Sequence, residues 1–133
     1  MSRILVAEDN PITAEMIATR LSNAGYEVVR AENGHQTLEC AASRSPDLIL
    51  LDVMMPEMDG LEATRAIRGL PQGRELPILA MTANAFEEDR KACIEAGMND
   101  HVPKPVDPDI LFAALSRWLQ LSLQSRSQTS RGG

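Results

Sequence analysis

The chain has 133 residues and a formal net charge of −6, and 44% of its residues are apolar. This length suits one domain of ordinary size with a buried core. The acidic balance argues against direct binding to nucleic acid, because such proteins usually carry a basic face. No apolar run is long enough to cross a membrane, and the N-terminus does not resemble a signal peptide, so we expect a soluble, cytoplasmic protein.

Short apolar runs alternate with amphipathic segments along the chain. Apolar runs predict buried strands, and apolar residues at helical spacing, bounded by Gly or Pro, predict helices. In chain order the predicted elements are a strand at 4–7, a helix at 11–24, a strand at 27–31, a short helix around 38–42, a strand at 48–51, a helix around 61–67, a loop at 70–76, a strand at 77–81, a helix at 86–96, a strand at 101–102 and a helix from 108 to at least 119. The Ser-rich segment 122–133 lacks apolar periodicity, so we expect a domain at 1–121 followed by a disordered tail or linker.

Five strand–helix units in series predict an α/β fold, with one open parallel sheet and helices on both of its faces. Right-handed crossovers then bring the carboxyl ends of all strands to one edge of the sheet. Binding sites in such sheets form at that edge. Residues just past the strand ends are therefore the first candidates for function.

Polar side chains stand at four of these strand ends: Glu8 and Asp9, Asp52, Thr82 and Lys104. Three carboxylates at one edge repel one another unless a cation or a proton intervenes, and Mg²⁺ prefers such oxygen ligands. A carboxylate beside Mg²⁺ can attack phosphorus, while a lysine and a hydroxyl bind the transferring phosphoryl group. Each residue alone has a plainer explanation, such as a helix cap for Asp52, but the complete set favours phosphoryl transfer.

Five stretches resemble the receiver domains of two-component response regulators, and most closely those of hybrid sensor histidine kinases: residues 4–10, 47–60, 77–83, 96–100 and 104–105. The resemblance runs from about Arg3 to Leu121. It implies a single flavodoxin-like (βα)5 doubly wound sheet with strand order 2-1-3-4-5.

By this resemblance Asp52 is the phospho-acceptor. Asp9 and Asp52 would bind Mg²⁺ (or Mn²⁺) directly, the backbone carbonyl of Met54 would be a third ligand, and Glu8 would act through a metal-bound water. Met54 and Asn84 would tune hydrolysis of the acyl phosphate. An apolar Met54 should hinder an attacking water, which predicts a phosphoryl lifetime of minutes or longer.

The resemblance also assigns residues around the phosphoryl group. Lys104 would bridge to it through a cis bond before Pro105, and Thr82 would follow it as the switch residue. Gly60 would allow the tight turn into the third helix. His101 stands where the family often has Tyr or Phe, a ring that swings inward with the threonine. A switching ring and a partly exposed histidine without such a role both remain open.

The implied function is a phosphorelay or switch module in two-component signalling. A histidine kinase would phosphorylate Asp52, and the group would repack the face of the fourth helix, fifth strand and fifth helix, or pass to a histidine phosphotransfer domain. We expect a monomer or weak dimer, not an enzyme acting on an external metabolite, and the domain can be part of a kinase chain. The rivals are a haloacid-dehalogenase-type phosphatase, which needs an acid where Met54 stands, and a degenerate receiver that only binds other proteins.

Overall fold

The structure is a computed structural model that describes residues 2–55, 58–83 and 87–132, of which 72, 87–89 and 122–132 are described by their backbone alone. Strands and helices alternate along the chain. They are β1 (Arg3–Ala7), α1 (Pro11–Asn23), β2 (Glu27–Ala31), α2 (Gly34–Ser43), β3 (Leu48–Asp52), α3 (Gly60–Arg68), a 3₁₀ turn η1 (Pro71–Gly73), β4 (Ile78–Thr82), α4 (Glu87–Ala96), β5 (Asp100–Pro103) and α5 (Pro108–Gly132).

The strands form one parallel sheet in the order β2-β1-β3-β4-β5, as the resemblance implied. All five residues of β3, the central strand, are buried. Its apolar side chains face helices on both sides, which explains why the sequence at 48–51 lacks the alternation of a half-exposed strand. The register pairs Ala7 of β1 with Leu51, and Asp52 with Met81 of β4, so these strands end side by side.

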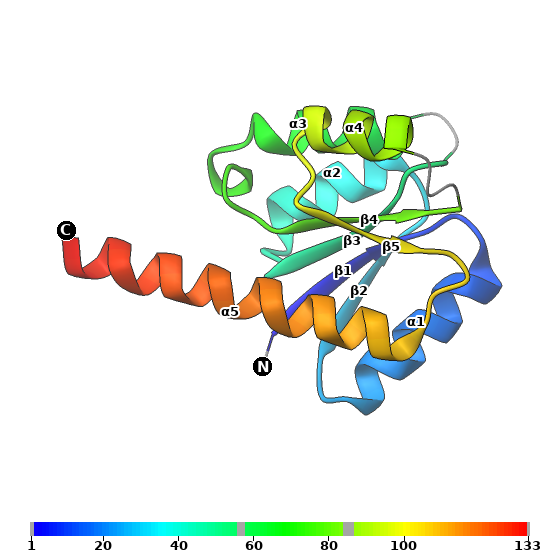
Figure 1. The fold of residues 1–133 in the computed structure, drawn as a ribbon, viewed down its shortest axis with the longest axis horizontal. Coiled ribbons are helices and arrows are strands. Elements are labelled where there is room, and N and C mark those ends of the chain that lie inside the picture. The colour runs from blue at the N-terminus through cyan, green and yellow to red at the C-terminus, as the bar shows by residue number, and fades with distance from the viewer. Residues whose placement is uncertain (1, 56–57, 84–86, 133) are drawn as a thin grey trace.

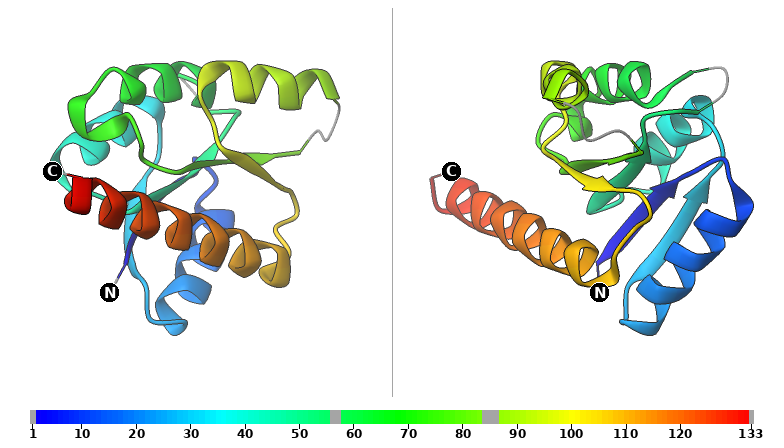
Figure 2. Two further views of the ribbon diagram at one scale, coloured as in Figure 1. Left: turned by 60° about the vertical axis from the view of Figure 1, so that its left-hand side comes forward. Right: turned by 45° about the vertical axis from the view of Figure 1, so that its right-hand side comes forward.

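Two apolar clusters hold the helices against the sheet. On one face, α1 and α5 pack through side chains such as Ile17, Leu21 and Leu115 onto the side of β1 that carries Ile4 and Val6. On the other face, α2, α3 and α4 pack around Leu5, Ile49 and their neighbours. Figures 1 and 2 show this three-layer arrangement, with α1 and α5 on one side and the other helices opposite. All strands therefore point their carboxyl ends toward one open edge.

Three helices begin at or near that edge with a polar cap. The Oδ1 atom of Asn10 accepts hydrogen bonds from Ile12 N at 2.9 Å and Thr13 N at 3.2 Å, which starts α1 just after Asp9. Asn33 and Asp59 cap α2 and α3 in the same way. Because a cap fixes where the chain turns from strand to helix, these residues hold the loops of the site.

The opposite edge is held by the guanidinium of Arg68, at the end of α3. It donates to the carbonyls of Gly73, Leu76 and Gly97 and to Oδ1 of Asn99, over distances of 2.6–3.0 Å. Burial lowers the pKa of this arginine. The side chain thus joins α3, η1 and the turn before β5 through backbone groups that would otherwise lack partners.

Two segments differ from the sequence-based expectation. The predicted loop at 70–76 contains the turn η1, which Pro71 starts with its fixed φ. The helix α5 continues past Leu121 to Gly132, so the backbone of 122–132 is helical where disorder was predicted. Figure 1 shows this part of α5 projecting beyond the sheet. The division into a domain and a linker stays a prediction.

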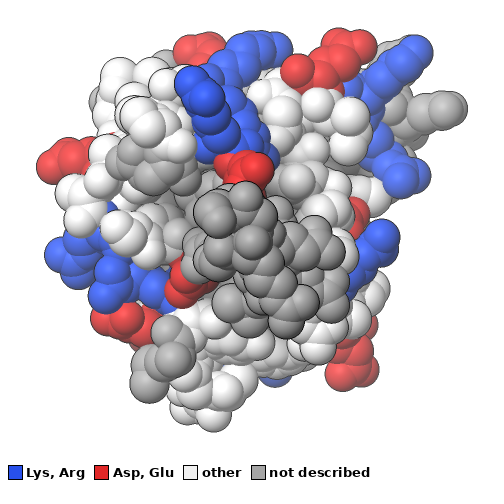
Figure 3. Space-filling view, turned by 90° about the vertical axis from the view of Figure 1, so that its left-hand side faces the viewer, with Lys and Arg blue, Asp and Glu red and all other residues white. Residues whose placement is uncertain are grey.

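The described surface mixes charges of both signs. On the face in Figure 3, basic side chains lie interspersed with acidic ones. Among the helices of the described chain, none combines the length and the apolar character needed to cross a membrane.

Candidate functional site

Three carboxylates meet at the carboxyl ends of β1 and β3. Glu8 and Asp52 are 2% and 3% exposed, whereas Asp9 is exposed. One oxygen from each lies within 4.8 Å of the others. The parallel pairing of β1 with β3 produces this cluster, because it places Glu8 one residue past Ala7 and Asp52 one residue past Leu51 in the same register. The predicted clustering of Glu8, Asp9 and Asp52 is confirmed.

The ammonium of Lys104 lies between the two buried carboxylates. Its Nζ is 2.8 Å from Oε1 of Glu8 and 3.2 Å from Oδ2 of Asp52. The backbone N of Lys104 donates to the carbonyl of Thr82 at 2.8 Å, which fixes the residue beside the end of β4. The bond between Lys104 and Pro105 is cis, as predicted. A residue from the end of the chain therefore completes a cluster that begins at Glu8.

Thr82 and Met54 flank Asp52. Thr82 is the last residue of β4 and is 8% exposed. The backbone N of Met54 donates to Oδ1 of Asp52 at 3.1 Å, while the Met54 side chain is 77% exposed. Asp52 thus has one oxygen held by the Met54 backbone amide and the other by Lys104.

Gly60 lies directly against the main chain of Asp52. A Cβ atom there would lie 2.9 Å from Val53 Cα and closer still to the carbonyl oxygen of Asp52. Its backbone N donates to the Val53 carbonyl at 3.0 Å. The resemblance implied that Gly60 allows a tight turn into the third helix, and the structure shows close packing of the first turn of α3 on the end of β3 at this residue.

Burial and the neighbouring charges set the protonation of the cluster. Burial, followed by the close carboxyl group of Asp52, raises the pKa of Glu8 from 4.5 to about 7, although Lys104 opposes the shift. Burial alone would lower the pKa of Lys104, but hydrogen bonds and attraction from Glu8 and Asp52 outweigh it, and the net shift is upward. Lys104 therefore stays charged and neutralises only part of the carboxylate charge.

The remaining charge and one unused oxygen suit a divalent cation. Oε2 of Glu8 is buried and has no hydrogen-bond partner among the described residues. A buried acceptor without a partner is costly, so it indicates a site for a water or an ion. Oxygen donors in this number fit Mg²⁺, which keeps several waters in its coordination shell. The predicted donors Glu8, Asp9 and Asp52 therefore fit the metal.

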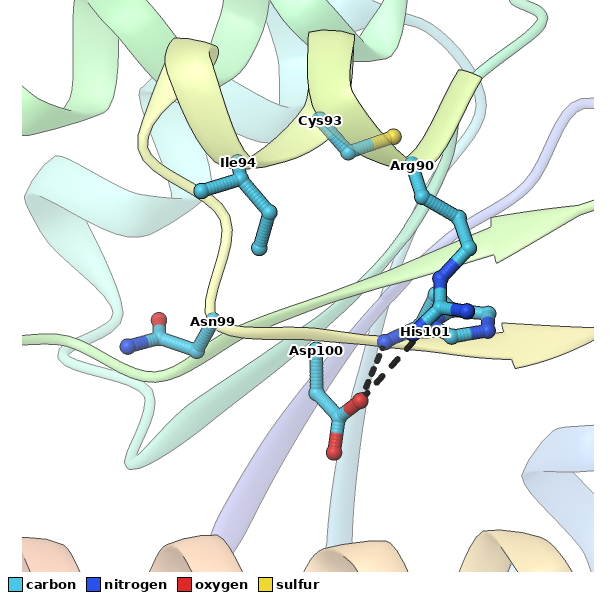
Figure 4. Close-up of a pocket in the computed structure, with 6 residues that line it drawn as sticks. All are labelled: Arg90, Cys93, Ile94, Asn99, Asp100 and His101. Carbon is cyan, nitrogen blue, oxygen red and sulfur yellow. Dashed lines mark hydrogen bonds and ion pairs between the residues drawn. The ribbon is translucent and has the colours of Figure 1, made fainter. Parts of the chain in front are cut away.

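His101 lies outside this cluster, on the face between α4 and β5. It lines a hollow of about 190 Å³ together with Arg90, Cys93, Ile94, Asn99 and Asp100. Figure 4 shows the Asp100 carboxylate reaching toward His101, whose Nδ1 is 3.7 Å from Oδ1 of Asp100. The side chain of His101 is 25% exposed. Asn84 lies outside the described residues, so its predicted role stays untested.

The structure adds a link that the sequence did not suggest. Oδ1 of Asp100 accepts from the backbone N of His101 at 2.8 Å, and Oδ2 accepts from Trp118 Nε1 of α5 at 2.9 Å. Asp100 thus ties the histidine to the last helix. A buried indole usually finds an acceptor, but nothing in the sequence pairs Trp118 with this particular acid.

Comparisons with known proteins match nearly the whole folded part. A family model for the response regulator receiver domain matches residues 4–116. An uncharacterised 14.6 kDa protein of Leptolyngbya boryana is 44% identical over 105 residues, which cover 79% of this chain and 80% of that protein. The sensor histidine kinase RcsC of Escherichia coli is 37% identical over 123 residues. That match covers 92% of this chain but only 13% of RcsC, so the chain corresponds to a small part of the kinase.

Solved structures give the same result. The receiver domain of the sensor histidine kinase PA1611 of Pseudomonas aeruginosa is 41% identical and superposes with a TM-score of 0.84, covering 90% of this chain and 98% of that one. That structure is described with a magnesium ion coordinated in its active site cleft. The chemotaxis response regulator CheY4 of Vibrio cholerae is 32% identical with a TM-score of 0.85, covering 89% of this chain and 98% of that one.

The raised pKa of Glu8 predicts a pH-dependent stability of the metal-free protein. The folded chain holds the Glu8 proton more tightly than the unfolded chain between pH 4.5 and about 7. The unfolding free energy should therefore fall as pH rises through this window, by on the order of 1–3 kcal/mol. Urea titrations in a chelator at several pH values measure the slope. Glu8→Gln should flatten this dependence of the unfolding free energy on pH, whereas Glu95→Gln, at an exposed site, should leave it unchanged. Parallel pH dependences for wild type and Glu8→Gln would contradict the raised pKa of Glu8.

Proposed function

This chain belongs to the response regulator receiver domain family of two-component signalling, and on that premise we propose that Asp52 accepts a phosphoryl group from a phosphohistidine of a histidine kinase. One observation carries the proposal: the Nζ of Lys104 lies 3.2 Å from the buried Asp52 carboxylate, in the same cluster as Glu8 and Asp9. This cluster combines a nucleophile, a fixed cation and oxygen donors for a metal.

The transfer needs no external co-reactant. An oxygen of Asp52 forms a bond to phosphorus while the P–N bond of the phosphohistidine breaks, and the imidazole keeps the electron pair. Lys104 stays in place and stabilises the negative charge on the phosphoryl oxygens. The Met54 amide and Lys104 orient the carboxylate before the reaction. A bound Mg²⁺, held by Asp9, Asp52 and the Met54 carbonyl with Glu8 acting through water, would supply further charge neutralisation; Mn²⁺ could replace it.

Through Thr82 and His101, phosphorylation of Asp52 would change the surface formed by α4, β5 and α5. Thr82 ends β4, the strand next to β3, and its hydroxyl would follow a phosphoryl group on Asp52. The His101 ring lines a hollow beside α4, and an inward movement would take the ring out of this hollow. Asp100 connects His101 to α5 through its hydrogen bond with Trp118. Phosphorylation would shift the population between two arrangements of α4, β5 and α5.

We infer a relay role from the relatives, which include hybrid kinases. The partner of Asp52 would be a histidine kinase or a histidine phosphotransfer domain, and the chain would act in the cytoplasm as a monomer or weak dimer without binding nucleic acid. It would turn over no external metabolite. The phosphatase alternative has nothing to favour it, since Met54 stands where that chemistry needs an acid. A degenerate receiver is disfavoured by the complete set of Glu8, Asp9, Asp52, Thr82 and Lys104.

The acceptor assignment is tested by phosphorylation with acetyl phosphate and Mg²⁺. Wild type should gain the mass of one phosphoryl group, measured on the intact protein, and Asp52→Asn should gain none because an amide is a poor nucleophile. Asp109→Asn, an exposed acid in the first turn of α5, is the matched control and should behave as wild type. Equal mass gain in Asp52→Asn and wild type would refute the acceptor.

The exposed Met54 side chain predicts a long-lived acyl phosphate. An apolar group at the mouth of the site cannot orient an attacking water, so the half-life in excess Mg²⁺ should be minutes or longer. Met54→Asn should shorten it by offering a hydrogen-bonding side chain at the same place. Decay of the phosphorylated protein after removal of phosphodonor measures both. A wild-type half-life of a few seconds is the result that rules the idea out.

Trp118, the single tryptophan of the chain, offers a readout for His101. If the ring moves inward, the Asp100–Trp118 hydrogen bond should rearrange, and beryllofluoride with Mg²⁺ should change the Trp118 emission. His101→Ala should abolish that change while leaving phosphorylation of Asp52 intact. His35→Ala, which removes the other histidine from the exposed side of α2, is the control. An undiminished response in His101→Ala would show that His101 has no switching role.

A further inference from the structure

Gly34, the first residue of α2, is buried against the loop that follows Asp52. A Cβ atom built on Gly34 would lie 2.6 Å from Cβ and 2.7 Å from Cγ of Met58, and closer still to the carbonyl oxygen of Met58. Real Cβ atoms essentially never come this close to other heavy atoms. Because one of the obstructing atoms belongs to the backbone, a side chain at position 34 could be accommodated only if the loop itself moved.

The conformation of Gly34 does not explain the glycine. Among the described residues only Gly25 and Gly97 are glycines with a positive φ. Gly34 begins a helix after a capping asparagine, a position that any residue except a poor helix former can take. The requirement at this position is space, and the space is filled by Met58.

The methionines near Met58 differ in burial: Met55 and Met58 contact the apolar core, whereas Met54 is exposed. Met55 is buried in the apolar cluster shared by α2 and α3, and Met58 packs partly against the same cluster. Met54, in contrast, is exposed at the mouth of the site. Met55 and Met58 therefore both contact the apolar cluster, and the Gly34–Met58 contact sets how closely Met58 approaches α2.

A short run of contacts joins this point to the acceptor. After Met58, the Asp59 side chain accepts a hydrogen bond from Glu62 N at 2.9 Å and starts α3. The next residue, Gly60, donates from its backbone N to the Val53 carbonyl and packs on the carbonyl of Asp52. Two glycine contacts thus fix the loop, one against α2 and one against the end of β3.

We infer that Gly34 is a positioning residue for the Asp52 site: by admitting Met58 against α2, it sets the loop that presents the Met54 backbone to the metal and to Asp52. This inference deepens the proposed function and rests on it. Metal affinity responds strongly to groups behind the ligands, and displacing them typically weakens binding 10–100-fold. A loop displaced by an added methyl group should therefore bind Mg²⁺ poorly even though none of the carboxylates has changed.

The direct test is Gly34→Ala, with Mg²⁺ affinity measured by isothermal titration calorimetry and folding checked by circular dichroism. We expect Mg²⁺ to bind at least about tenfold more weakly than to wild type. The half-saturating Mg²⁺ concentration for phosphorylation by acetyl phosphate should rise in parallel, with the rate at saturating Mg²⁺ less affected. Gly69→Ala is the matched control: Gly69 also sits at a helix end, its added Cβ would come no closer than 3.3 Å to another atom, and it lies at the far end of α3.

Met58→Ala approaches the same contact from the loop and adds no atom, so it remains informative if Gly34→Ala fails to fold. It should weaken Mg²⁺ binding by removing the anchor, whereas Leu70→Ala, which removes another partly buried side chain from the same apolar cluster, should not. In the double variant the loss should be smaller than the sum of the single losses, because both changes disturb the same contact between Met58 and α2.

Each outcome bears on one of the two claims. A folded Gly34→Ala with wild-type Mg²⁺ affinity, unchanged affinity in Met58→Ala, or strictly additive losses in the double variant would each overturn the positioning role. If wild type itself neither binds Mg²⁺ nor gains a phosphoryl group on Asp52, the proposed function fails instead.

Discussion

The shared ammonium of Lys104 is the interaction on which the site depends. Two buried carboxylates, Glu8 and Asp52, lie against one cation, and the charges do not cancel. The shortfall appears as the raised pKa of Glu8 and as an oxygen without a partner. A buried acid whose charge is only partly compensated contributes little to stability. Glu8 is held in this position because β1 pairs with β3 up to the preceding residue, Ala7. The fold thus keeps an excess of negative charge that a divalent cation is suited to neutralise.

The same strand register separates the carboxylate cluster from the group of side chains around His101. The carboxylates lie at the ends of β1 and β3, whereas His101, Asp100 and Trp118 lie on the outer face of β5 and on α5. The pairing of β4 with β5 and the backbone hydrogen bond from Lys104 to Thr82 connect the two regions. Short connections of this kind suit a two-state element, because a small displacement at the end of β4 reaches the edge strand without passing through the core.

The cluster could be predicted from the sequence because the carboxyl ends of parallel strands lie at one edge of the sheet. Residues after β1, β3 and β5 had to meet, and Glu8, Asp52 and Lys104 do. The strand order came from resemblance, since periodicity does not rank strands. The Asp100–Trp118 bond and the Gly34–Met58 contact were out of reach, because each depends on side-chain packing between segments distant in sequence. For Gly60 the resemblance implied a tight turn, and the structure adds a close approach of the first turn of α3 to the Asp52 backbone. Composition suggested a disordered tail or linker at 122–133; the backbone of 122–132 is helical, and the division into a domain and a tail stays a prediction.

The two edges of the sheet have a consequence for aggregation. β5 is a four-residue edge strand that ends in Pro103, which has no N–H to offer, and begins with the polar pair Asp100 and His101. The other edge, β2, carries exposed Glu27 and Arg30. Short, charged or proline-ended edges resist pairing with strands of other molecules. Both edges of this sheet therefore have features that disfavour edge-to-edge aggregation.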